Sequence, residues 1–405
     1  MRLLHGNEMH FVRCPDGRVY ATAVANYAWW VDYLAVFDEV LVVARMKQVA
    51  EMYPAESLAE GPGVRFEPLP DFRGPEDYLR KSHAVQRIMK EAISKCDAYL
   101  FRVPGTMGYL GAKELQKQGK PYALEVVGDP YDVFTAGSVK HPMRAFFRQW
   151  HARSLRSCCQ NASATMYVTA AALQRRYPPS PQVFTTHYSD VELPAQAYAS
   201  APRNGIQRGD TFKLIFIGTL AQLYKAPDVL IDAVHLCHQR GLNVSLAFAG
   251  DGACRPALEA QAARYGLSGH IRFLGHVGDP AALTRLLDEA DVFVLPSRAE
   301  GLPRAMMEAM ARALPCIGSD VDGIPELLAP EDLVPPNDPK ALADKIIEVS
   351  ADSARRNRMS ARNLKRAADF RTEIMMERKV SFCRYIYDMS LVQSIRQARP
   401  TEVTA

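Results

Sequence analysis

Two glutamates in one short stretch of the sequence, Glu300 and Glu308, stand with seven residues between them. The apolar segment 291–295 before them is short enough for a buried parallel strand. Pro303 suits the first turn of a helix, and residues 305–313 are good helix formers with one apolar stripe. This pattern predicts a strand, then a loop that carries Glu300, then a helix that carries Glu308.

A loop carboxylate and a helix carboxylate at such a place suit a ligand that has both phosphate and sugar hydroxyls. Ligands of open α/β sheets bind at the carboxyl ends of strands, where a helix N-terminus favours an anion. A carboxylate there accepts hydrogen bonds from a vicinal diol, as in ribose or a hexose. The alternative is structural, with Glu300 capping the helix and Glu308 merely solvated. The two glutamates alone do not decide between these interpretations.

The residues around the two glutamates favour the ligand site. From Pro296 to Ala311 they read Pro-Ser-x-x-Glu-Gly-x-Pro-x-x-x-x-Glu-Ala-Met-Ala. This stretch resembles the E-x7-E signature of the family-4 class of retaining glycosyltransferases, which use nucleotide sugars. The resemblance implies an α/β protein of the GT-B fold, in which two Rossmann-like α/β/α domains face each other across a cleft.

Phosphate binding is predicted in the segment after the strand expected at 212–217. The comparable family segment supplies Gly, often Arg, and Lys to the donor diphosphate, and Gly218 and Lys225 match it. Thr219 stands where the Arg is usual. Arg298 is a candidate replacement for that cation, although a salt bridge at the rim explains Arg298 as well. Charge on a departing phosphate needs fixed donors such as Lys225, backbone N–H groups and a helix dipole.

The family resemblance also implies the other donor contacts. Glu308 should hold the ribose diol, and Glu300 should contact hydroxyls of the donor sugar. Loops after two further predicted strands resemble the segments that line the cleft and read the nucleotide base. Asp322 replaces the first glycine of a segment that otherwise resembles the family's Gly-Gly-x-x-Glu. The predicted donor set is Gly218, Thr219, Lys225, Gly250, Asp251, Gly252, His276, Val277, Arg298, Glu300, Gly301, Leu302, Pro303 and Glu308.

The N-terminal half resembles the family only in architecture, and we expect it to bind the acceptor. A first strand is expected at 10–13. Asp129 follows the predicted strand 122–127, where the family often has a side chain that faces the reacting centre, and an Asp-Pro turn is the alternative. Many family members have a Gly-Gly loop after the first strand, whereas here only Gly17 lies nearby. The acceptor contacts therefore stay open.

The segment from Lys140 to Arg176 holds seven Lys and Arg residues and no Asp or Glu. Aromatic residues, among them Phe146, Phe147 and Trp150, are interleaved with them. A basic helix with aromatics can lie on an anionic membrane surface, or it can collect a phosphorylated or lipid-diphosphate acceptor. The alternative is a solvated helix whose aromatics pack on the sheet.

Composition bounds the class of protein. At 405 residues the chain is long enough for two domains, and a net charge of +4 does not demand a nucleic-acid partner. Eight cysteines without a C-x-x-C pattern, and no apolar run of membrane-spanning or signal-peptide length, indicate a cytoplasmic protein. It could also be peripheral on the inner face of the membrane. The predicted domains are 1–195, joined by a crossover helix at 373–392, and 207–372, with the last N-terminal strand at 165–169.

These patterns and the resemblance together predict a hexosyltransferase. Its catalytic candidates are Glu300, Lys225 and Asp129. No His/Cys cluster has the spacing of a metal site, so we expect no metal and no cofactor beyond a UDP- or GDP-linked co-substrate. The resemblance implies retaining transfer to a glycan or lipid-linked acceptor, by default in cell-surface polysaccharide or lipopolysaccharide synthesis. The alternatives are a nucleotide-sugar epimerase of the same fold and a catalytically silent nucleotide-sugar-binding protein. An NAD-dependent dehydrogenase is disfavoured because no G-x-G-x-x-G follows a strand.

Overall fold

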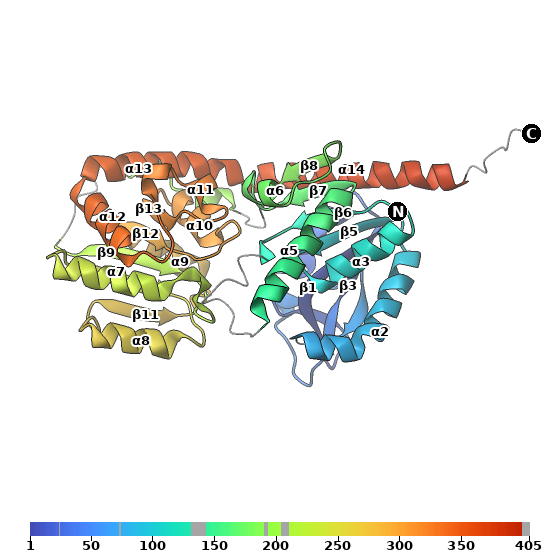
Figure 1. The fold of residues 1–405 in the computed structure, drawn as a ribbon, viewed down its shortest axis with the longest axis horizontal. Coiled ribbons are helices and arrows are strands. Elements are labelled where there is room, and N and C mark those ends of the chain that lie inside the picture. The colour runs from blue at the N-terminus through green and yellow to red at the C-terminus, as the bar shows by residue number, and fades with distance from the viewer. Residues whose placement is uncertain (24, 73, 131–142, 190–192, 204–209, 399–405) are drawn as a thin grey trace, which may run out of the picture. The chain divides into compact units, whose positions relative to one another are not determined.

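The computed structural model describes the chain except at residues 24, 73, 131–142, 190–192, 204–209 and 399–405. The chain forms two compact α/β units (Figure 1). The first comprises Met1–Gly128, Trp150–Tyr188 and Met376–Ala405, and the second comprises Asp129–Gln149 and Ser189–Met375. Lys140, at the start of the predicted basic segment, lies outside the described residues.

The first unit is built on a sheet that has eight strands among the described residues, in the order β4-β3-β1-β5-β6-β7-β8 with β2 on β1. Every pair is parallel except β1–β2. Its central strands are almost wholly buried, which fits the apolar runs that predicted them. The strands are β1 (Arg2–Arg13), β2 (Val19–Ala21), β3 (Glu39–Gln48), β4 (Val64–Pro70), β5 (Ala98–Val103), β6 (Ala123–Val126), β7 (Ala164–Tyr167) and β8 (Phe184–His187).

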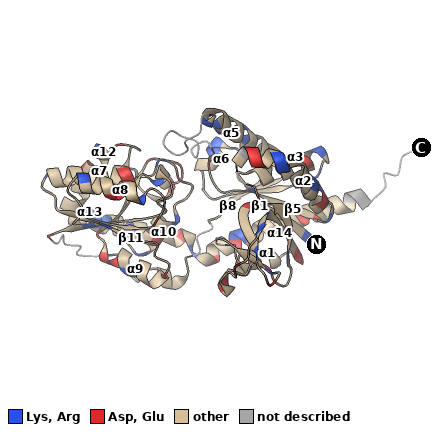
Figure 2. Cartoon of the chain, turned by 90° about the horizontal axis from the view of Figure 1, so that it is seen from below, with Lys and Arg blue, Asp and Glu red and all other residues tan. Residues whose placement is uncertain are grey.

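Helices cover both faces of this sheet, with α2, α3 and α5 on one face and α1 and α14 on the other (Figure 2). The 27-residue helix α14 begins in the second unit and returns to the first. There Phe382 and Tyr385 stack on Phe184. The elements are α1 (Tyr27–Leu34), α2 (Gly74–Ser94), α3 (Thr106–Lys117), α5 (Arg144–Asn161), α6 (Ala172–Arg176), α14 (Thr372–Ala398) and the 3-10 turn η1 (Ala55–Ser57).

Two strand predictions in this unit were wrong. The first strand starts at Arg2 rather than at residue 10, because the polar residues His5 and Asn7 interrupt its apolar pattern although both are fully buried. The strand expected at 165–169 is not the last one, since β8 follows it and pairs with β7 in parallel. That edge strand reads Phe-Thr-Thr-His and is only partly buried, so it carries little hydrophobic signal.

A buried polar cluster ties α1, the sheet and α14 together. The Glu125 carboxylate on β6 accepts hydrogen bonds from the Tyr33 hydroxyl (2.5 Å) and from Arg102 (3.3 Å), and His5 Nε2 lies 3.7 Å away. Lys379 of α14 is 1% exposed and pairs with Asp32 of α1 at 2.9 Å. Burial alone would raise the pKa of Glu125, but His5, Arg102 and Lys379 outweigh it and lower that pKa to about 2.

The second unit has a six-stranded, all-parallel sheet within the described residues, in the order β11-β10-β9-β12-β13-β14. Its strands are β9 (Phe212–Ile217), β10 (Val244–Ala249), β11 (Ile271–Gly275), β12 (Val292–Leu295), β13 (Cys316–Ser319) and β14 (Leu333–Val334). Its helices are α7 (Pro227–Gln239), α8 (Arg255–Arg264), α9 (Pro280–Glu289), α10 (Arg304–Ala311), α11 (Ile324–Leu327), α12 (Pro339–Ala351) and α13 (Ser353–Ala367). Its 3-10 turns are η2 (Ala195–Ala197), η3 (Leu223–Lys225), η4 (Pro330–Asp332) and η5 (Ala368–Phe370).

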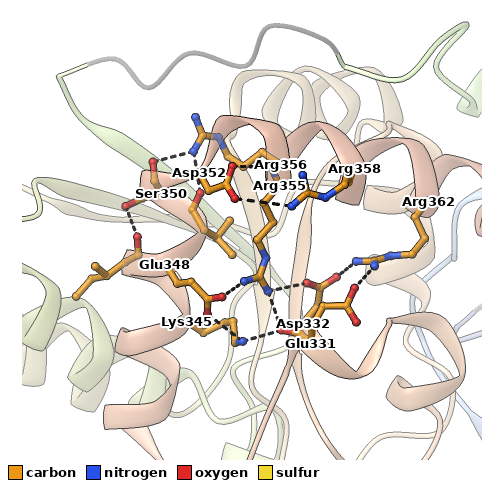
Figure 3. Close-up of polar contacts among 12 residues, drawn as sticks. Glu331, Asp332, Lys345, Glu348, Ser350, Asp352, Arg355, Arg356, Arg358 and Arg362 are labelled. Atoms are coloured by element: carbon orange, nitrogen blue, oxygen red, sulfur yellow. Dashed lines mark hydrogen bonds and ion pairs between the residues drawn. The ribbon is translucent and has the colours of Figure 1, made fainter.

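Ion pairs join η4 to α13 and α13 to α12 (Figure 3). Asp332 is fully buried and pairs with Arg355 at 3.1 Å and with Arg362. Arg355 also donates to the Glu331 carbonyl at 2.7 Å and pairs with Glu348. These arginines of the basic helix α13 are therefore engaged within the unit.

We predict that the stability of the first unit depends on pH through Glu125. The folded-state pKa of about 2 lies below the unfolded value of about 4.3. The stabilisation is therefore present above about pH 4.3 and is lost as the pH falls toward 2. Glu125→Gln leaves the buried cations uncompensated and should lower the free energy of unfolding at neutral pH by about 3–5 kcal/mol.

Urea unfolding followed by tryptophan fluorescence measures this change, because all three tryptophans (Trp29, Trp30 and Trp150) lie in the first unit. The exposed variant Glu51→Gln is the control. Parallel acid-side stability curves for Glu125→Gln and the wild type would contradict the prediction.

Candidate active site

The predicted donor residues of the second unit lie on loops at one edge of its sheet. β9, β10 and β12 are parallel neighbours, so the loops that follow them leave the sheet at the same edge. The loop after β9 carries Gly218 and leads into η3 with Lys225, and the loop after β12 carries Glu300. The structure thus brings together segments that are about 75 positions apart in the chain.

Lys225 and Glu300 form an ion pair at the centre of this edge. Lys225 Nζ donates to Glu300 Oε2 at 2.6 Å, and each side chain is only 12% exposed. The hydroxyl of Ser297 approaches the same carboxylate oxygen at 3.4 Å. Glu300 does not cap α10, whose N-cap is Pro303 without a side-chain hydrogen bond. The alternative that Glu300 is a helix cap is therefore wrong.

Three glycines near the Lys225–Glu300 ion pair allow close contacts between the backbone and neighbouring groups. A Cβ on Gly218 would lie 2.6 Å from Cδ of Lys225. A Cβ on Gly250 would lie 1.8 Å from the Gly218 carbonyl oxygen, and a Cβ on Gly252 would lie 2.1 Å from the Ala221 nitrogen. The aliphatic stem of Lys225 consequently runs across bare backbone, and any side chain at these positions would displace one loop from the other.

Arg298 is held by protein groups. Its guanidinium forms a bidentate pair with Asp228 at 2.9 and 2.7 Å, and it also donates to the Leu223 carbonyl and to Asn337. The side chain is 13% exposed. Because the Leu223 carbonyl belongs to η3, these contacts fix the turn that carries Lys225. They favour the salt-bridge interpretation of Arg298 over the replacement of a phosphate-binding cation.

The second glutamate lies on α10, one turn from that helix's first residue. Glu308 accepts a hydrogen bond from Arg304 at 2.9 Å and is 19% exposed, whereas Arg304 is 58% exposed. Glu308 is therefore paired and mostly covered. The predicted contacts Gly301, Leu302 and Pro303 form the loop that enters α10, with Pro303 buried and the other two half-buried.

The remaining predicted donor residues lie on the same sheet edge but are more exposed. The Thr219 hydroxyl accepts a hydrogen bond from the Ala221 N–H at 3.1 Å, within its own turn. His276 is exposed and Val277 is half-buried after β11. Asp251 is exposed and pairs with Arg255 at 3.2 Å.

Arg255 was missed by the sequence reasoning. It stands at the first position of α8, also pairs with Glu259, and lies over the Phe273 ring at 5.9 Å. It is a cation beside the predicted base-reading loop. No motif marks it, because its place depends on how α8 packs against β11.

Asp322, another residue outside the predicted donor set, contacts the Glu300 loop directly. Its carboxylate accepts a hydrogen bond from the Glu300 N–H at 2.8 Å. Asp320 and Asp322 follow β13 in an Asp-x-Asp pattern. Even so, the described part of the chain contains no group of three or more His, Cys, Asp or Glu residues that could hold a metal ion. That the reaction needs no metal stays a prediction.

Asp129 follows β6 and is 7% exposed. By its contacts it groups with residues 129–149 of the second unit, whereas β6 belongs to the first. Its role at the reacting centre stays a prediction.

A comparison with known families decides the identity of the second unit. Residues 211–352, which hold the predicted donor set, match the family model described as Glycosyl transferases group 1. The match places this segment in the group 1 glycosyltransferase family, and the chain is a glycosyltransferase. Its enzyme class, transfer of glycosyl groups, agrees with the prediction. Over nearly its whole length this glycosyltransferase is also similar to Protein CapJ of Staphylococcus aureus, with 27% identity over 402 residues, 98% of this chain and 100% of that protein.

Solved structures show the same fold over the whole chain. Sucrose-phosphate synthase from Thermosynechococcus elongatus superimposes with a TM-score of 0.66 and 18% identity, covering 98% of this glycosyltransferase and 100% of the other chain. Anabaena HepE in complex with UDP-glucose gives a TM-score of 0.59 and 17% identity, covering 97% and 100%. The predicted fold class, two Rossmann-like units of the GT-B type, is confirmed.

We predict that Arg298 and Asp228 act as one unit that anchors η3. Either alanine variant should remove the bidentate pair and lower the stability of the second unit. A double-mutant cycle should give a coupling energy of about 1.5–3 kcal/mol, the range for hydrogen bonds between charged groups. Differential scanning calorimetry measures it. The exposed pair Arg358–Asp352, at 3.7 Å, is the matched control and should couple by about 0–1 kcal/mol.

Binding of UDP separates this role from direct phosphate binding. If Arg298 anchors Lys225, Arg298→Ala and Asp228→Ala weaken UDP binding alike. If Arg298 bound the phosphate, removal of its carboxylate partner in Asp228→Ala would leave binding unchanged or stronger.

Proposed function

We propose that this glycosyltransferase moves a hexose from a nucleotide diphosphate sugar to a glycan or lipid-linked acceptor, with retention of the anomeric configuration, as in the family-4 class. The observation that carries the proposal is the Lys225–Glu300 ion pair at the carboxyl edge of the second sheet, close to the start of α10. A mostly buried lysine and carboxylate in contact present one partner for phosphate and one for sugar hydroxyls.

The donor site would work by exchange of partners. A diphosphate that enters the edge competes with Glu300 for Lys225 Nζ, which is a strong hydrogen-bond donor. The freed Glu300 carboxylate then accepts hydrogen bonds from the donor sugar, while Glu308 holds the ribose diol. Lys225, backbone N–H groups of the glycine loops and the N-terminus of α10 stabilise the charge that develops on the departing diphosphate. The acceptor hydroxyl arrives on the leaving-group face, and Asp129 is our candidate for a side chain facing it.

The proposal includes a nucleotide, UDP or GDP, and a class of acceptor. The UDP-glucose complex of HepE makes UDP the first nucleotide to test, with GDP as the alternative. We propose that the acceptor belongs to a cell-surface polysaccharide or lipopolysaccharide. A nucleotide-sugar epimerase would instead convert the donor to its epimer without any acceptor. A silent binder would hold the donor without turnover.

We also propose that α5 contacts an anionic membrane surface. No helix in the described part of the chain has the length and apolar character needed to cross a bilayer. α5 carries basic residues and no acidic one (Figure 2). On it Phe146 is 57% and Trp150 44% exposed, and Arg153 is exposed one turn further along. An exposed aromatic pair beside cations is the composition of a surface-seeking helix.

We expect Lys225→Ala and Glu308→Ala to abolish nucleotide-sugar binding measured by calorimetry against UDP, GDP and their sugars. Lys225→Ala should also lower the rate of nucleoside diphosphate release by about 10²–10³-fold, the usual loss for one preorganised donor. Lys340→Ala, a lysine 74% exposed on α12, is the control and should change neither. Wild-type binding that survives both substitutions would show that the donor site lies elsewhere. The anomeric configuration of the product, read by NMR, tests retention.

We expect the protein to float with vesicles that contain phosphatidylglycerol and not with pure phosphatidylcholine. The double variant Phe146→Ser/Trp150→Ser should lose this binding, and Arg153→Glu should weaken it by about 1 kcal/mol or more, since one cation near an anionic surface contributes about that much. Leu79→Ser, at a position 69% exposed on α2, is the control. Equal flotation of all variants would refute the role of α5.

A further inference from the structure

The end of β13 and the loop after it contact the loop that carries Glu300 at three points. The Ser319 hydroxyl donates to the Ser297 carbonyl at 2.5 Å, and both residues are fully buried. The Asp322 carboxylate accepts from the Glu300 N–H at 2.8 Å. Gly323 packs so closely on Gly301 that a Cβ there would lie 2.1 Å from the Gly301 carbonyl oxygen.

Asp322 holds its place in a backbone conformation that usually favours glycine. Its φ is +48°, in the left-handed region. Among residues other than glycine, Asp and Asn adopt this region most readily. At position 322 this chain has Asp where the similar family has the first glycine of its Gly-Gly-x-x-Glu segment. Asp322 can therefore adopt the backbone conformation of that glycine and adds a carboxylate. That carboxylate reaches the backbone of the residue whose side chain pairs with Lys225.

These contacts hold Glu300 both at its carboxylate and at its backbone. Lys225 and Ser297 contact its carboxylate, and Asp322 fixes its backbone nitrogen. When a diphosphate displaces the carboxylate from Lys225, the side-chain contact is lost but the backbone hydrogen bond remains. The Ser297 contact is long at 3.4 Å, so the Asp322 hydrogen bond at 2.8 Å is the shorter of the two that can hold Glu300 in place while the sugar is bound.

We propose that Asp322 is a positioning residue for Glu300, and that it contributes to recognition of the donor sugar but not of the nucleotide. This step rests on the proposed function, because it takes Glu300 as the group that contacts the sugar. Asp322 acts on sugar recognition through Glu300.

Two substitutions separate positioning from structural support. Asp322→Asn tolerates positive φ and keeps a side-chain oxygen that can accept the Glu300 N–H. Asp322→Gly relieves the backbone strain and removes the acceptor. If Asp322 had no positioning role, Asp322→Gly would be as stable as the wild type or more stable. Neither the exchange rate of the Glu300 amide nor the affinity for sugar nucleotides would then change.

The first measurement needs no ligand. Hydrogen exchange of the Glu300 amide, followed by NMR, should be about tenfold faster or more in Asp322→Gly, because a charge-assisted hydrogen bond is lost. It should stay close to the wild-type rate in Asp322→Asn. Unchanged protection of this amide in Asp322→Gly would overturn the proposal.

The second measurement compares UDP-glucose with UDP and GDP-mannose with GDP on each protein by calorimetry. We expect the affinity ratio of sugar nucleotide to nucleotide to fall about tenfold or more in Asp322→Gly and to be retained in Asp322→Asn. Both substitutions remove the same negative charge, so Asp322→Asn controls for the effect of that charge on the ratio. An unchanged ratio in Asp322→Gly, with the wild type binding normally, overturns the inference alone. A wild type that binds neither sugar nucleotide overturns the proposed donor site and, with it, a role for Asp322 in sugar recognition.

Discussion

The ion pair between Lys225 and Glu300 is the interaction on which the rest of the site depends. It joins a turn after β9 to a loop after β12, and the Arg298 N–H donates to the Tyr224 carbonyl at 2.7 Å beside it. Each side chain is 12% exposed, so both charges have lost most of their water. Such a pair offsets its desolvation only if its geometry is good and the remaining donors and acceptors are satisfied. The contacts around it meet those conditions.

Each half of the pair has its own support. The turn that carries Lys225 is held through the Leu223 carbonyl by Arg298, which is itself fixed by Asp228. The loop that carries Glu300 is held by Ser319 and Asp322 from β13. Because the supporting groups are engaged with protein, Lys225 and Glu300 are the members of this network left to exchange partners with a ligand.

The sequence predicts those features of the site that depend on neighbouring residues, but not those that depend on contacts between residues far apart in the chain. The strand, loop and helix around Glu300 are local, and residues 291–313 predicted all three. The bond between Lys225 and Glu300, and that between Arg298 and Asp228, join residues 75 and 70 positions apart. No periodicity encodes such contacts, although the resemblance placed Lys225 and Glu300 in one site. Arg298 and Arg255 show the limit, since their roles depend on which carboxylate each one meets.

In the first unit, several buried residues are polar, and the sequence pattern does not identify them as buried. His5 and Asn7 are completely buried in β1, yet they break the apolar run that marks a central strand. Glu125 is likewise a charged residue in the middle of the sheet, and its partners come from α1, β1, β5 and α14. A sequence pattern treats each of these as a surface position. Only the assembled unit shows that the Glu125 carboxylate meets Tyr33, Arg102 and His5 inside the protein.

The backbone geometry of the site explains why position 322 accepts a side chain whereas position 323 does not. At Gly323 the φ is ordinary, but a Cβ would collide with the Gly301 carbonyl oxygen at 2.1 Å. At position 322 the constraint is the backbone angle φ of +48°, which Asp can adopt. Steric contact therefore requires glycine at 323, whereas backbone conformation merely prefers it at 322. A position of the second kind can acquire a side chain at modest cost, and here that side chain reaches the backbone nitrogen of Glu300.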